Sequence, residues 1–315
     1  MIFIAELCQN HNGDYELLKD MVYAAKDGGA DYVKIQSIFA DMLTFRESFE
    51  KGLDIDNRKV HIKRPYKLEY TRLKQLELTY DQQADFVELC NKINIKPLTT
   101  AFNILSIPKI QEIGFDEIKV ASYDCGSIPL IKQLKSQFKQ IFLSTGASYD
   151  TEIEHAAKVL KGNNFSMLHC VTIYPTPLHE FHLSRMDYLK QYTTNVGWSD
   201  HSLLKKDGIK GTLAAVYFGA SVIERHFSII DAGKTKDGPI SIGKDDIKEI
   251  KLFGSLSKKD QEIYLNDIFP NYQITWGNQK RELTDTELLN RYYYRGRFGN
   301  YKSDGSMFYN WVNDN

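Results

Sequence analysis

The amino-acid sequence predicts an α/β protein, and specifically a (β/α)8 TIM barrel followed by an irregular C-terminal extension. Short runs of β-branched and apolar residues alternate with segments in which apolar residues recur every three or four positions, and this alternation is typical of parallel β/α units. Eight such units follow one another, and eight is the number that closes a barrel. A doubly wound open sheet is the competing architecture, but the Gly-x-Gly-x-x-Gly fingerprint common in that fold is missing after the first strand.

The first two units are the clearest. Residues 3–6 form a short apolar run that predicts a strand, and Asp14 is placed to cap a following helix that Gly28 ends. Residues 32–36 predict the second strand. A long polar and aromatic insertion, from about residue 40 to residue 74, separates this strand from the next helix, and insertions of this length are typical of functional or mobile loops.

The remaining units repeat the same alternation. Further strands are expected over residues 96–100, 117–121, 140–145, 166–170, 195–198 and 221–225. Further helices are expected over residues 81–93, 104–113, 128–135, 151–160, 183–191, 206–218 and 244–253. The barrel is therefore predicted to occupy residues 1–257, and residues 258–315 form the C-terminal extension.

Composition and charge favour a small-molecule or protein partner. The 315 residues include 40 Lys and Arg against 41 Asp and Glu, a formal net charge of -1, and no long run of one sign indicates a nucleic-acid or membrane-surface partner. The apolar run at the N-terminus is too short for a signal peptide, and no stretch approaches a membrane span. The four cysteines are too widely spaced for structural zinc, so we expect reduced thiols in a cytoplasmic protein.

Polar residues gather where the predicted strands end, which is the edge at which (β/α)8 barrels carry out chemistry. Lys34 and Lys119 lie within apolar strands, where burial of an unpaired ammonium group is costly. One interpretation is that each lysine buries its stem and extends its charged end to water. Together with Ser122, Ser144 and Ser199 on the same rim, the two lysines favour a bound anion that carries phosphate and carboxylate groups.

Two histidines, His201 and His226, follow the last two predicted strands, which are neighbours in a closed barrel. Neutral imidazole is a common ligand of transition metals, so the pair predicts a metal site, although either histidine alone is more typical of a hydrogen-bonded polar residue. His169 also ends a strand, and we expect it to pack within the site or to orient a neighbour. The other histidines, expected at the surface, are His11, His61, His155, His179 and His182.

Several independent motifs occupy the predicted strand ends. The opening contains Ile4-Ala5-Glu6, Asn10-His11-Asn12-Gly13 and Gly29-Ala30-Asp31-Tyr32-Val33-Lys34-Ile35-Gln36. The later motifs are Lys119-Val120-Ala121-Ser122, Leu143-Ser144-Thr145-Gly146, His169-Cys170, Tyr174-Pro175-Thr176-Pro177, Trp198-Ser199-Asp200-His201-Ser202 and Ile223-Glu224-Arg225-His226-Phe227. In order and spacing these motifs resemble those of the sialic acid (N-acetylneuraminate) synthase family of nonulosonic acid synthases, over about residues 1 to 255.

The resemblance implies an enzyme that condenses phosphoenolpyruvate with an N-acylhexosamine-type aldehyde, such as N-acetylmannosamine, to give a nonulosonic 2-keto-3-deoxy acid and phosphate. It implies that phosphoenolpyruvate is bound by Lys34, Lys119, Ser122, Ser144 and Ser199. It implies that the acceptor sugar is bound by Gln36, Asp124, Tyr174 and Asp237, and a divalent metal by His201 and His226. Glu6 would join Lys34 and Lys119 as a catalytic residue, orienting water or the aldehyde near the metal and taking part in proton transfer.

The implied metal suits this chemistry. Phosphoenolpyruvate is a weak carbon nucleophile, so the aldehyde has to be made more electrophilic, and a divalent ion does this as a Lewis acid. The cationic pocket of Lys34 and Lys119 would stabilise the departing phosphate. The resemblance implies Mn²⁺, with Mg²⁺ or Co²⁺ as alternatives, and a homodimer. The residues themselves do not identify the metal, the acceptor sugar or the oligomeric state.

The sequence departs from the family in its acceptor pocket and at its end. Tyr123 and Asp124 replace a glycine and a glutamate, Ala101 replaces a proline, and the insertion at residues 57–70 matches the family poorly. Residues 258–315 are too few and too irregular for the antifreeze-like domain that, in the family, supplies an arginine to the sugar. The extension is predicted either to pack on the barrel's own surface or to use Arg295 or Arg297 in place of that arginine.

Two other functions are open at this stage. The chain is also compatible with a metal-dependent aldolase, or with a phosphoenolpyruvate-condensing synthase that acts on a different aldehyde, such as a phosphorylated or non-acetylated sugar. A catalytically silent barrel that binds a sugar or a protein is the second alternative. The presence of both lysines and both histidines argues against the silent barrel, because a binding module does not need an anion site and a metal site together.

Overall fold

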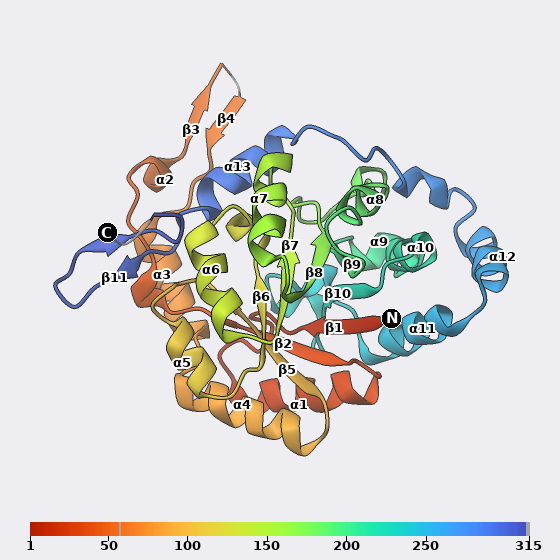
Figure 1. Cartoon of the computed structure of the whole chain (residues 1–315), viewed down its shortest axis with the longest axis horizontal. Helices are drawn as coiled ribbons and strands as arrows, with labels where there is room; N and C mark the ends of the chain where they lie inside the picture. The colour runs from red at the N-terminus through yellow and green to blue at the C-terminus, as the bar shows by residue number, and fades with distance from the viewer. Residues whose placement is uncertain (57, 313–315) are drawn as a thin grey trace.

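The computed structural model describes residues 1–56 and 58–312, and eight parallel strands close into the predicted barrel (Figure 1). The strands are β1 (Ile2–Glu6), β2 (Tyr32–Ser37), β5 (Lys96–Ala101), β6 (Glu117–Val120), β7 (Gln140–Ser144), β8 (Asn164–His169), β9 (Val196–Asp200) and β10 (Val222–His226). Around the ring they follow the order β1-β10-β9-β8-β7-β6-β5-β2. The fold is therefore the (β/α)8 barrel that the alternation predicted, and the first and last strands of the series pair directly.

Helices surround the barrel, and most lie where the apolar spacing predicted them. They are α1 (Tyr15–Asp27), α4 (Tyr80–Lys92), α5 (Ile107–Glu112), α6 (Ile128–Gln137), α7 (Asp150–Leu160), α8 (Arg185–Leu189), α9 (Leu204–Asp207), α10 (Lys210–Phe218) and α11 (Lys244–Ser255). Asp14 caps α1 as expected, since its carboxylate accepts the N–H groups of Glu16 and Leu17. One expected helix, over residues 206–218, is wrong: Gly208 adopts a φ of +57° that a helix cannot continue, so α9 and α10 are separate.

An apolar layer crosses the barrel interior between two more polar ends. This layer is formed by Ile4, Tyr32, Leu98, Phe142, Leu168 and Val222. Side chains alternate along each strand, so the next inward positions lie above this layer, toward the carboxyl ends of the strands. There the register pairs Glu6 of β1 with Lys34 of β2 and with His226 of β10. The predicted site residues therefore meet above a solid floor.

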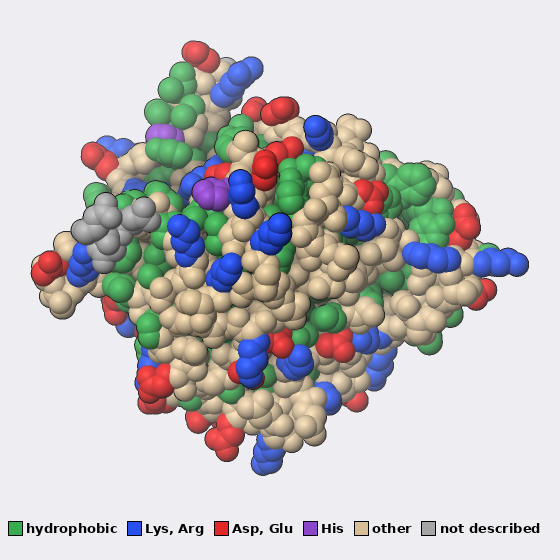
Figure 2. All heavy atoms as spheres, in the orientation of Figure 1, with side chains coloured by type: hydrophobic (Ala, Val, Ile, Leu, Met, Phe, Trp, Pro, Cys, Tyr) green, Lys and Arg blue, Asp and Glu red, His purple; other side chains and the backbone are tan. Residues whose placement is uncertain are grey.

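The insertion after β2 is more ordered than a loop. It contains the short helices η1 (Ala40–Met42) and α2 (Ser48–Lys51), the hairpin of β3 (Leu53–Ile55) and β4 (Arg58–His61), and helix α3 (Tyr66–Leu76), which the sequence did not predict. Asn57, the first residue of the segment that matches the family poorly, lies outside the described residues. The hairpin projects from the body of the protein (Figure 1), and Figure 2 shows hydrophobic side chains on it. Leu53, Ile55 and Val60 are the exposed ones.

The chain after α11 returns to the barrel. Helix α12 (Lys258–Ile268) packs against α10, and helix α13 (Asp285–Tyr294) lies on the opposite side, next to the insertion (Figure 1). A small hairpin of β11 (Asn300–Tyr301) and β12 (Met307–Phe308) follows, and Phe298 forms a β-bridge with Leu43. The cysteines are all free and buried. In the described part of the chain we find no helix with the length and apolarity that a membrane span requires.

Candidate functional site

A cavity of about 470 Å³ opens at the carboxyl ends of the barrel strands. Almost every site residue named from the sequence lines it. These residues are Glu6, Lys34, Gln36, Lys119, Ser122, Ser144, Tyr174, Ser199, His201, His226 and Asp237. They come from β1, β2, β6, β7, β9 and β10 and from the loops that follow β6, β8, β9 and β10, so closure of the barrel brings together side chains that are far apart in the sequence.

Lys34 is buried and lies between two carboxylates. It is 3% exposed, it forms an ion pair with Glu6, and its Nζ is 3.4 Å from Glu224. Burial alone would lower the pKa of this ammonium group, but the charges of Glu224 and Glu6 raise the pKa above its ordinary value. Lys34 is therefore charged at neutral pH. Its charged end lies in the cavity and does not extend to bulk water, which removes the first interpretation of this lysine.

Lys119, on β6, lies two strands from Lys34 around the barrel and lines the same pocket. It is 2% exposed, its Nζ donates to Ser144 Oγ at 2.6 Å, and it lies 3.7 Å from Glu224. Burial lowers the pKa of Lys119, and Glu224 only partly offsets this effect. An anionic ligand beside Lys119 would therefore strengthen its charged form.

The three serines lie near these lysines. Ser199 donates to Glu224 Oε1 at 2.8 Å, and Ser122 Oγ accepts the N–H of Gly146 at 3.2 Å. Gly146 has no room for a side chain, because a Cβ there would lie 2.9 Å from Ser122 Oγ and 2.7 Å from Thr172 Cγ2. The backbone at Gly146 therefore comes close enough to hold Ser122 at the edge of the cavity.

Glu224 is the main site residue that the sequence reasoning did not include. It is buried at the end of β10, and it contacts Lys34, Lys119 and Ser199. Burial would raise the pKa of this carboxyl group, but the charges of Lys119 and Lys34 lower it to about 2. Glu224 precedes His226 by two positions, so strand alternation places both on the same face of β10, and this spacing was the signal that could have identified it.

The two histidines meet as predicted. The ring centroids of His201 and His226 lie 5.3 Å apart, and Tyr174 packs edge-on against His201 at 4.6 Å. Burial, together with the neighbouring His226, lowers the pKa of His201 to about 3, so its imidazole is neutral. Within the described residues, His226 Nδ1 is buried and has no hydrogen-bond partner. Neutral, unpaired imidazole nitrogen is the form that binds metals.

A thiol and a carboxylate lie beside His226. Donor atoms of Cys8, His226 and Asp237 all lie within 4.8 Å of one another, and Cys8 Sγ contacts Asp237 Oδ2 at 3.3 Å. Burial would raise the pKa of Asp237, but His226 and the Cys8 contact lower it. Nitrogen, oxygen and sulfur donors in one buried cluster suit a divalent transition metal. Cys8 was not named from the sequence, and Asp237 was named only for the sugar.

Asp124 does not line this cavity. It belongs to a neighbouring small pocket, where its carboxylate accepts from Ser127 Oγ at 3.0 Å and from Asn310 Nδ2 at 3.3 Å. Burial raises the pKa of Asp124 to about 6. Residues of the C-terminal segment, among them Asn310, line this second pocket, so the geometry does not bring Asp124 to the other expected acceptor residues.

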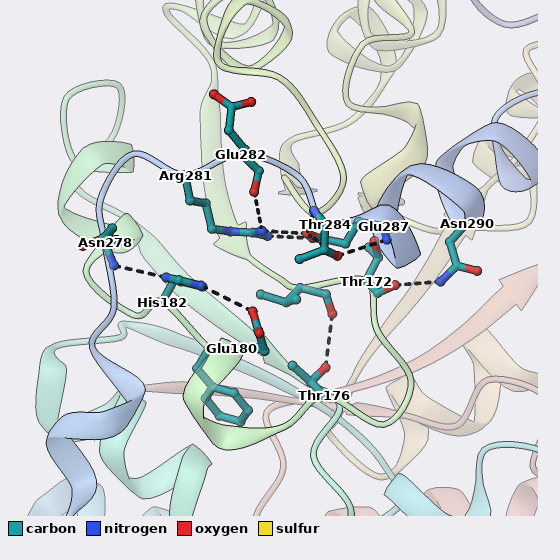
Figure 3. Close-up of polar contacts among 12 residues, drawn as sticks. Thr172, Thr176, Glu180, His182, Asn278, Arg281, Glu282, Thr284, Glu287 and Asn290 are labelled. Atoms are coloured by element: carbon teal, nitrogen blue, oxygen red, sulfur yellow. Dashed lines mark hydrogen bonds and ion pairs between the residues drawn. The ribbon is translucent and has the colours of Figure 1, made fainter. Parts of the chain in front are cut away.

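Helix α13 forms one wall of the cavity and is firmly anchored (Figure 3). Arg281 donates two hydrogen bonds of 2.6 Å to Glu287, which is fully buried, and Asn290 Nδ2 donates to the carbonyl of Thr172 at 2.8 Å. The residues of this segment that line the cavity are Thr286, Asn290, Tyr294 and Arg297. The C-terminal extension therefore contributes to the site within the same chain.

The other histidines differ in part from the expectation. His11 is wrong as a surface residue: it is 2% exposed, and its Nδ1 accepts the N–H of Gly13 at 3.1 Å in a tight turn. His169 is buried, with Nε2 2.8 Å from the carbonyl of Phe181 and its ring 5.1 Å from Trp198. It belongs to the core and does not line the cavity, so it is not packed within the site as one of the two expectations had it.

Comparison with known proteins gives the same family as the motifs. Residues 21–254 match the model of the NeuB family. The chain is 34% identical to the N,N'-diacetyllegionaminic acid synthase of Campylobacter jejuni over 80% of this chain and 73% of that protein, and 34% identical to the enzyme of the same name from Legionella pneumophila over 79% and 68%. The crystal structure of N-acetylneuraminic acid (sialic acid) synthetase from Leptospira borgpetersenii superposes with a TM-score of 0.68 at 26% identity, covering 93% of this chain and 90% of that one. The chain therefore belongs to the NeuB family.

Proposed function

We propose that this enzyme condenses phosphoenolpyruvate with a hexosamine-type sugar aldehyde and forms a nonulosonic 2-keto-3-deoxy acid and inorganic phosphate. The proposal rests on one observation: Lys34 and Lys119 line the same cavity as the two histidines. Both lysines are buried, and each lies close to a carboxylate. A cavity that binds an anion beside a metal is what this condensation needs. The names of the relatives support the same product class.

The anion pocket would hold phosphoenolpyruvate by charge and by hydrogen bonds. Lys34, Lys119 and Ser144 supply cationic and hydroxyl donors to phosphate and carboxylate oxygens. Ser122 and Ser199 add hydroxyl groups on the same side. Glu6 and Glu224 keep the two lysines extended toward the ligand, because each carboxylate holds an ammonium group by an ion pair.

The proposed reaction forms two bonds and breaks one. C3 of phosphoenolpyruvate attacks the aldehyde carbon, whose oxygen takes a proton, and water adds to C2. The proton that the water loses balances the one gained by the aldehyde oxygen. The tetrahedral species then breaks the bond between C2 and the phosphate ester oxygen, and the proton of the C2 hydroxyl leaves with the phosphate as the keto group forms. Lys34 and Lys119 would stabilise the charge that develops on the phosphate, and Glu6, which lines the cavity at the end of β1, would carry the proton to the aldehyde oxygen.

A divalent metal fits the cluster of Cys8, His226 and Asp237, with His201 alongside. When bound, the ion would supply Lewis-acid activation of the aldehyde. The resemblance favours Mn²⁺, with Mg²⁺ or Co²⁺ as alternatives. Gln36 and Tyr174 line the cavity and are the proposed acceptor contacts, together with Asp237.

The arrangement of the chain is part of the same proposal. Residues 1–257 would form the catalytic barrel, and residues 258–315 a C-terminal extension that contributes side chains to its cavity. Arg295 forms an ion pair with Glu152 at 2.7 Å outside the cavity, whereas Arg297 lines the cavity and is 8% exposed. Arg297 is therefore the better candidate for an acceptor-binding arginine. A homodimer and a cytoplasmic location remain expectations from the resemblance.

The test is inorganic phosphate release from phosphoenolpyruvate with Mn²⁺ and a panel of hexosamine acceptors, with product mass determined by mass spectrometry. We expect release that depends on an acceptor, stops with a chelator and resumes with added metal. Release without acceptor, or an aldol product without phosphate, would contradict the proposal. Folded, metal-loaded protein that is inactive with every acceptor would favour the silent barrel.

A further inference from the structure

The charged side chains of the cavity form two groups on different elements. The deep group lies at the strand ends, where the cations Lys34 and Lys119 are matched by the carboxylates Glu6 and Glu224. The second group surrounds the mouth and comes from loops and helices above the barrel. Its members are Arg64 before α3, Arg72 within α3, Lys236 between the turns that follow β10, and Arg297 after α13.

The mouth group carries more positive charge than its carboxylates balance. Arg72 donates to Glu69 at 2.9 and 3.0 Å, and Arg297 donates to the same Glu69, so two guanidinium groups share one carboxylate. In the described part of the chain, no ion pair or side-chain hydrogen bond involves Arg64 or Lys236. Both are exposed cations that line the cavity, and, against the effect of burial, the charge of Lys236 lowers the pKa values of Glu69 and Asp237, so these two carboxylates face four cations.

Arg297 shows that part of this group is built into the protein. It is 8% exposed, its backbone carbonyl accepts the N–H of Thr44 at 2.9 Å, and its guanidinium packs over Phe298 with 4.8 Å to the ring centroid. Its Nε has no hydrogen-bond partner among the described residues. A buried guanidinium with an unused donor is costly unless a ligand completes it.

These donors fit an anion better than a neutral sugar. Arginine and lysine side chains donate hydrogen bonds and accept none, whereas each sugar hydroxyl also offers a proton that needs an acceptor. A phosphate or carboxylate group accepts only, and guanidinium groups bind such groups with two parallel hydrogen bonds. The deep lysines are already assigned to phosphoenolpyruvate. The surplus positive charge at the mouth therefore points to the second substrate.

We infer that the acceptor sugar carries an anionic group, a phosphate or a carboxylate, at the end remote from its aldehyde, bound by Arg64, Lys236 and Arg297. The inference rests on the proposed function in that it names the substrate class for the same site. The aldehyde end would face His201 and His226, and the anionic end would face the mouth. A neutral hexosamine would leave the surplus positive charge of these side chains unmatched.

Binding without turnover tests the inference. Hexosamines reduced at C1 lack the aldehyde and cannot react, so their affinity for the full chain with phosphoenolpyruvate and Mn²⁺ is measurable by calorimetry. Three compounds are compared, which carry at C6 a hydroxyl, a phosphate or a carboxylate group. We expect an anionic compound to bind at least about tenfold more tightly than the neutral one, since hydrogen bonds to charged groups are strong. The tighter of the two anionic compounds identifies the group.

The variant for the test is R64Q/K236Q, which removes two mouth cations and leaves the deep group in place. It should abolish the preference for the anionic compound and leave the affinity for phosphoenolpyruvate unchanged. K234Q is the matched control, because Lys234 lies in the same loop and forms an ion pair with Asp231 at 3.6 Å. Equal binding of neutral and anionic compounds would overturn the inference. The inference would also be overturned if the double variant lost as much affinity for phosphoenolpyruvate as for the reduced sugar, because the cations would then bind the first substrate.

The binding test of the inference and the phosphate-release test of the proposed function can succeed or fail independently. Phosphate release reports the reaction, whereas the reduced compounds report recognition alone. Tight binding of an anionic compound to a protein that releases no phosphate would support the inference and contradict the condensation. Release with neutral acceptors only, combined with no anion preference, would support the condensation and contradict the inference.

Discussion

Asp200 and Arg225 form an ion pair of 3.0 Å between neighbouring strands, and both side chains are fully buried. Each residue directly precedes one of the two site histidines. Arg225 also donates to the carbonyls of Ser202 and Gly208, and Asp200 accepts the N–H of Ser202 at 2.7 Å. The pair therefore ties the loop after β9 to β10 and positions His201 relative to His226.

Breaking this pair should destabilise the protein strongly. The variant D200N leaves the Arg225 guanidinium buried without its counter-charge, so we expect the free energy of unfolding to fall by about 3–5 kcal/mol. The control D116N breaks the pair of Asp116 and Lys139, which is largely exposed, and should cost less than about 1 kcal/mol. Urea unfolding of both variants measures the difference. If D200N and D116N lost similar amounts of unfolding free energy, burial would not increase the contribution of the Asp200–Arg225 pair to stability.

Substitution of the buried lysines in the cavity should impair the reaction, whereas substitution of a lysine at the other end of the barrel should not. K34M and K119M retain the apolar stems and remove the charges, so we expect kcat/KM for phosphoenolpyruvate to fall at least about 100-fold. K96M is the control, because Lys96 lies at the opposite end of the barrel and pairs with Glu117 at 2.9 Å. It should leave the kinetics unchanged. If K34M and K119M kept the parent kcat/KM for phosphoenolpyruvate, the anion pocket would be wrongly assigned.

The metal cluster predicts a ranking of Mn²⁺ affinities. H226A removes the buried, unpaired Nδ1, and we expect the dissociation constant to rise by more than about tenfold. C8S should weaken binding in the same direction, because it removes the sulfur donor from the cluster. Electron paramagnetic resonance of free Mn²⁺ reports binding without turnover. The exposed His155 provides the control H155A, and equal affinities in all the proteins would exclude this cluster.

Asp124 should make stability depend on pH. Burial raises its pKa from 3.8 to about 6, so between these values the folded protein holds a proton that the unfolded chain has lost, and stability falls as the pH rises. The variant D124N removes this dependence and keeps an oxygen that accepts from Ser127. Its stability relative to the parent should therefore increase by about 2 kcal/mol between pH 4.5 and pH 7.5. Urea unfolding at the two pH values measures this, and parallel pH profiles would contradict the raised pKa.

The two tail arginines should differ in their effect on the acceptor. R297Q removes a cation that lines the cavity, and we expect the acceptor KM to rise about tenfold while the phosphoenolpyruvate KM is unchanged. R295Q removes a partner of Glu152 outside the cavity and should leave both constants unchanged. R297K keeps the charge and should recover part of the loss. A chain truncated at Asn290 that retains the parent acceptor KM would exclude any role of Arg297.

The site was predictable where local patterns encode it. Lys34 and Lys119 stand out because charged residues are rare in apolar strands, and His201 and His226 stand out because they follow consecutive strands. Glu224 lies in the same kind of position but was not included, since its role depends on two lysines from other strands. The motifs alone identified the family, and the comparisons confirm it.

The sequence by itself determined the alternation of strands and helices, and with it the barrel, because hydrophobic periodicity and capping residues such as Asp14 act over a few positions. Only the tertiary structure decided which residues meet. Cys8 contacts Asp237 across 229 positions of sequence, α13 lines the cavity, and Asp124 packs against Asn310 instead of facing the acceptor. Such contacts depend on strand register, barrel closure and the path of the tail, and no local pattern carries that information.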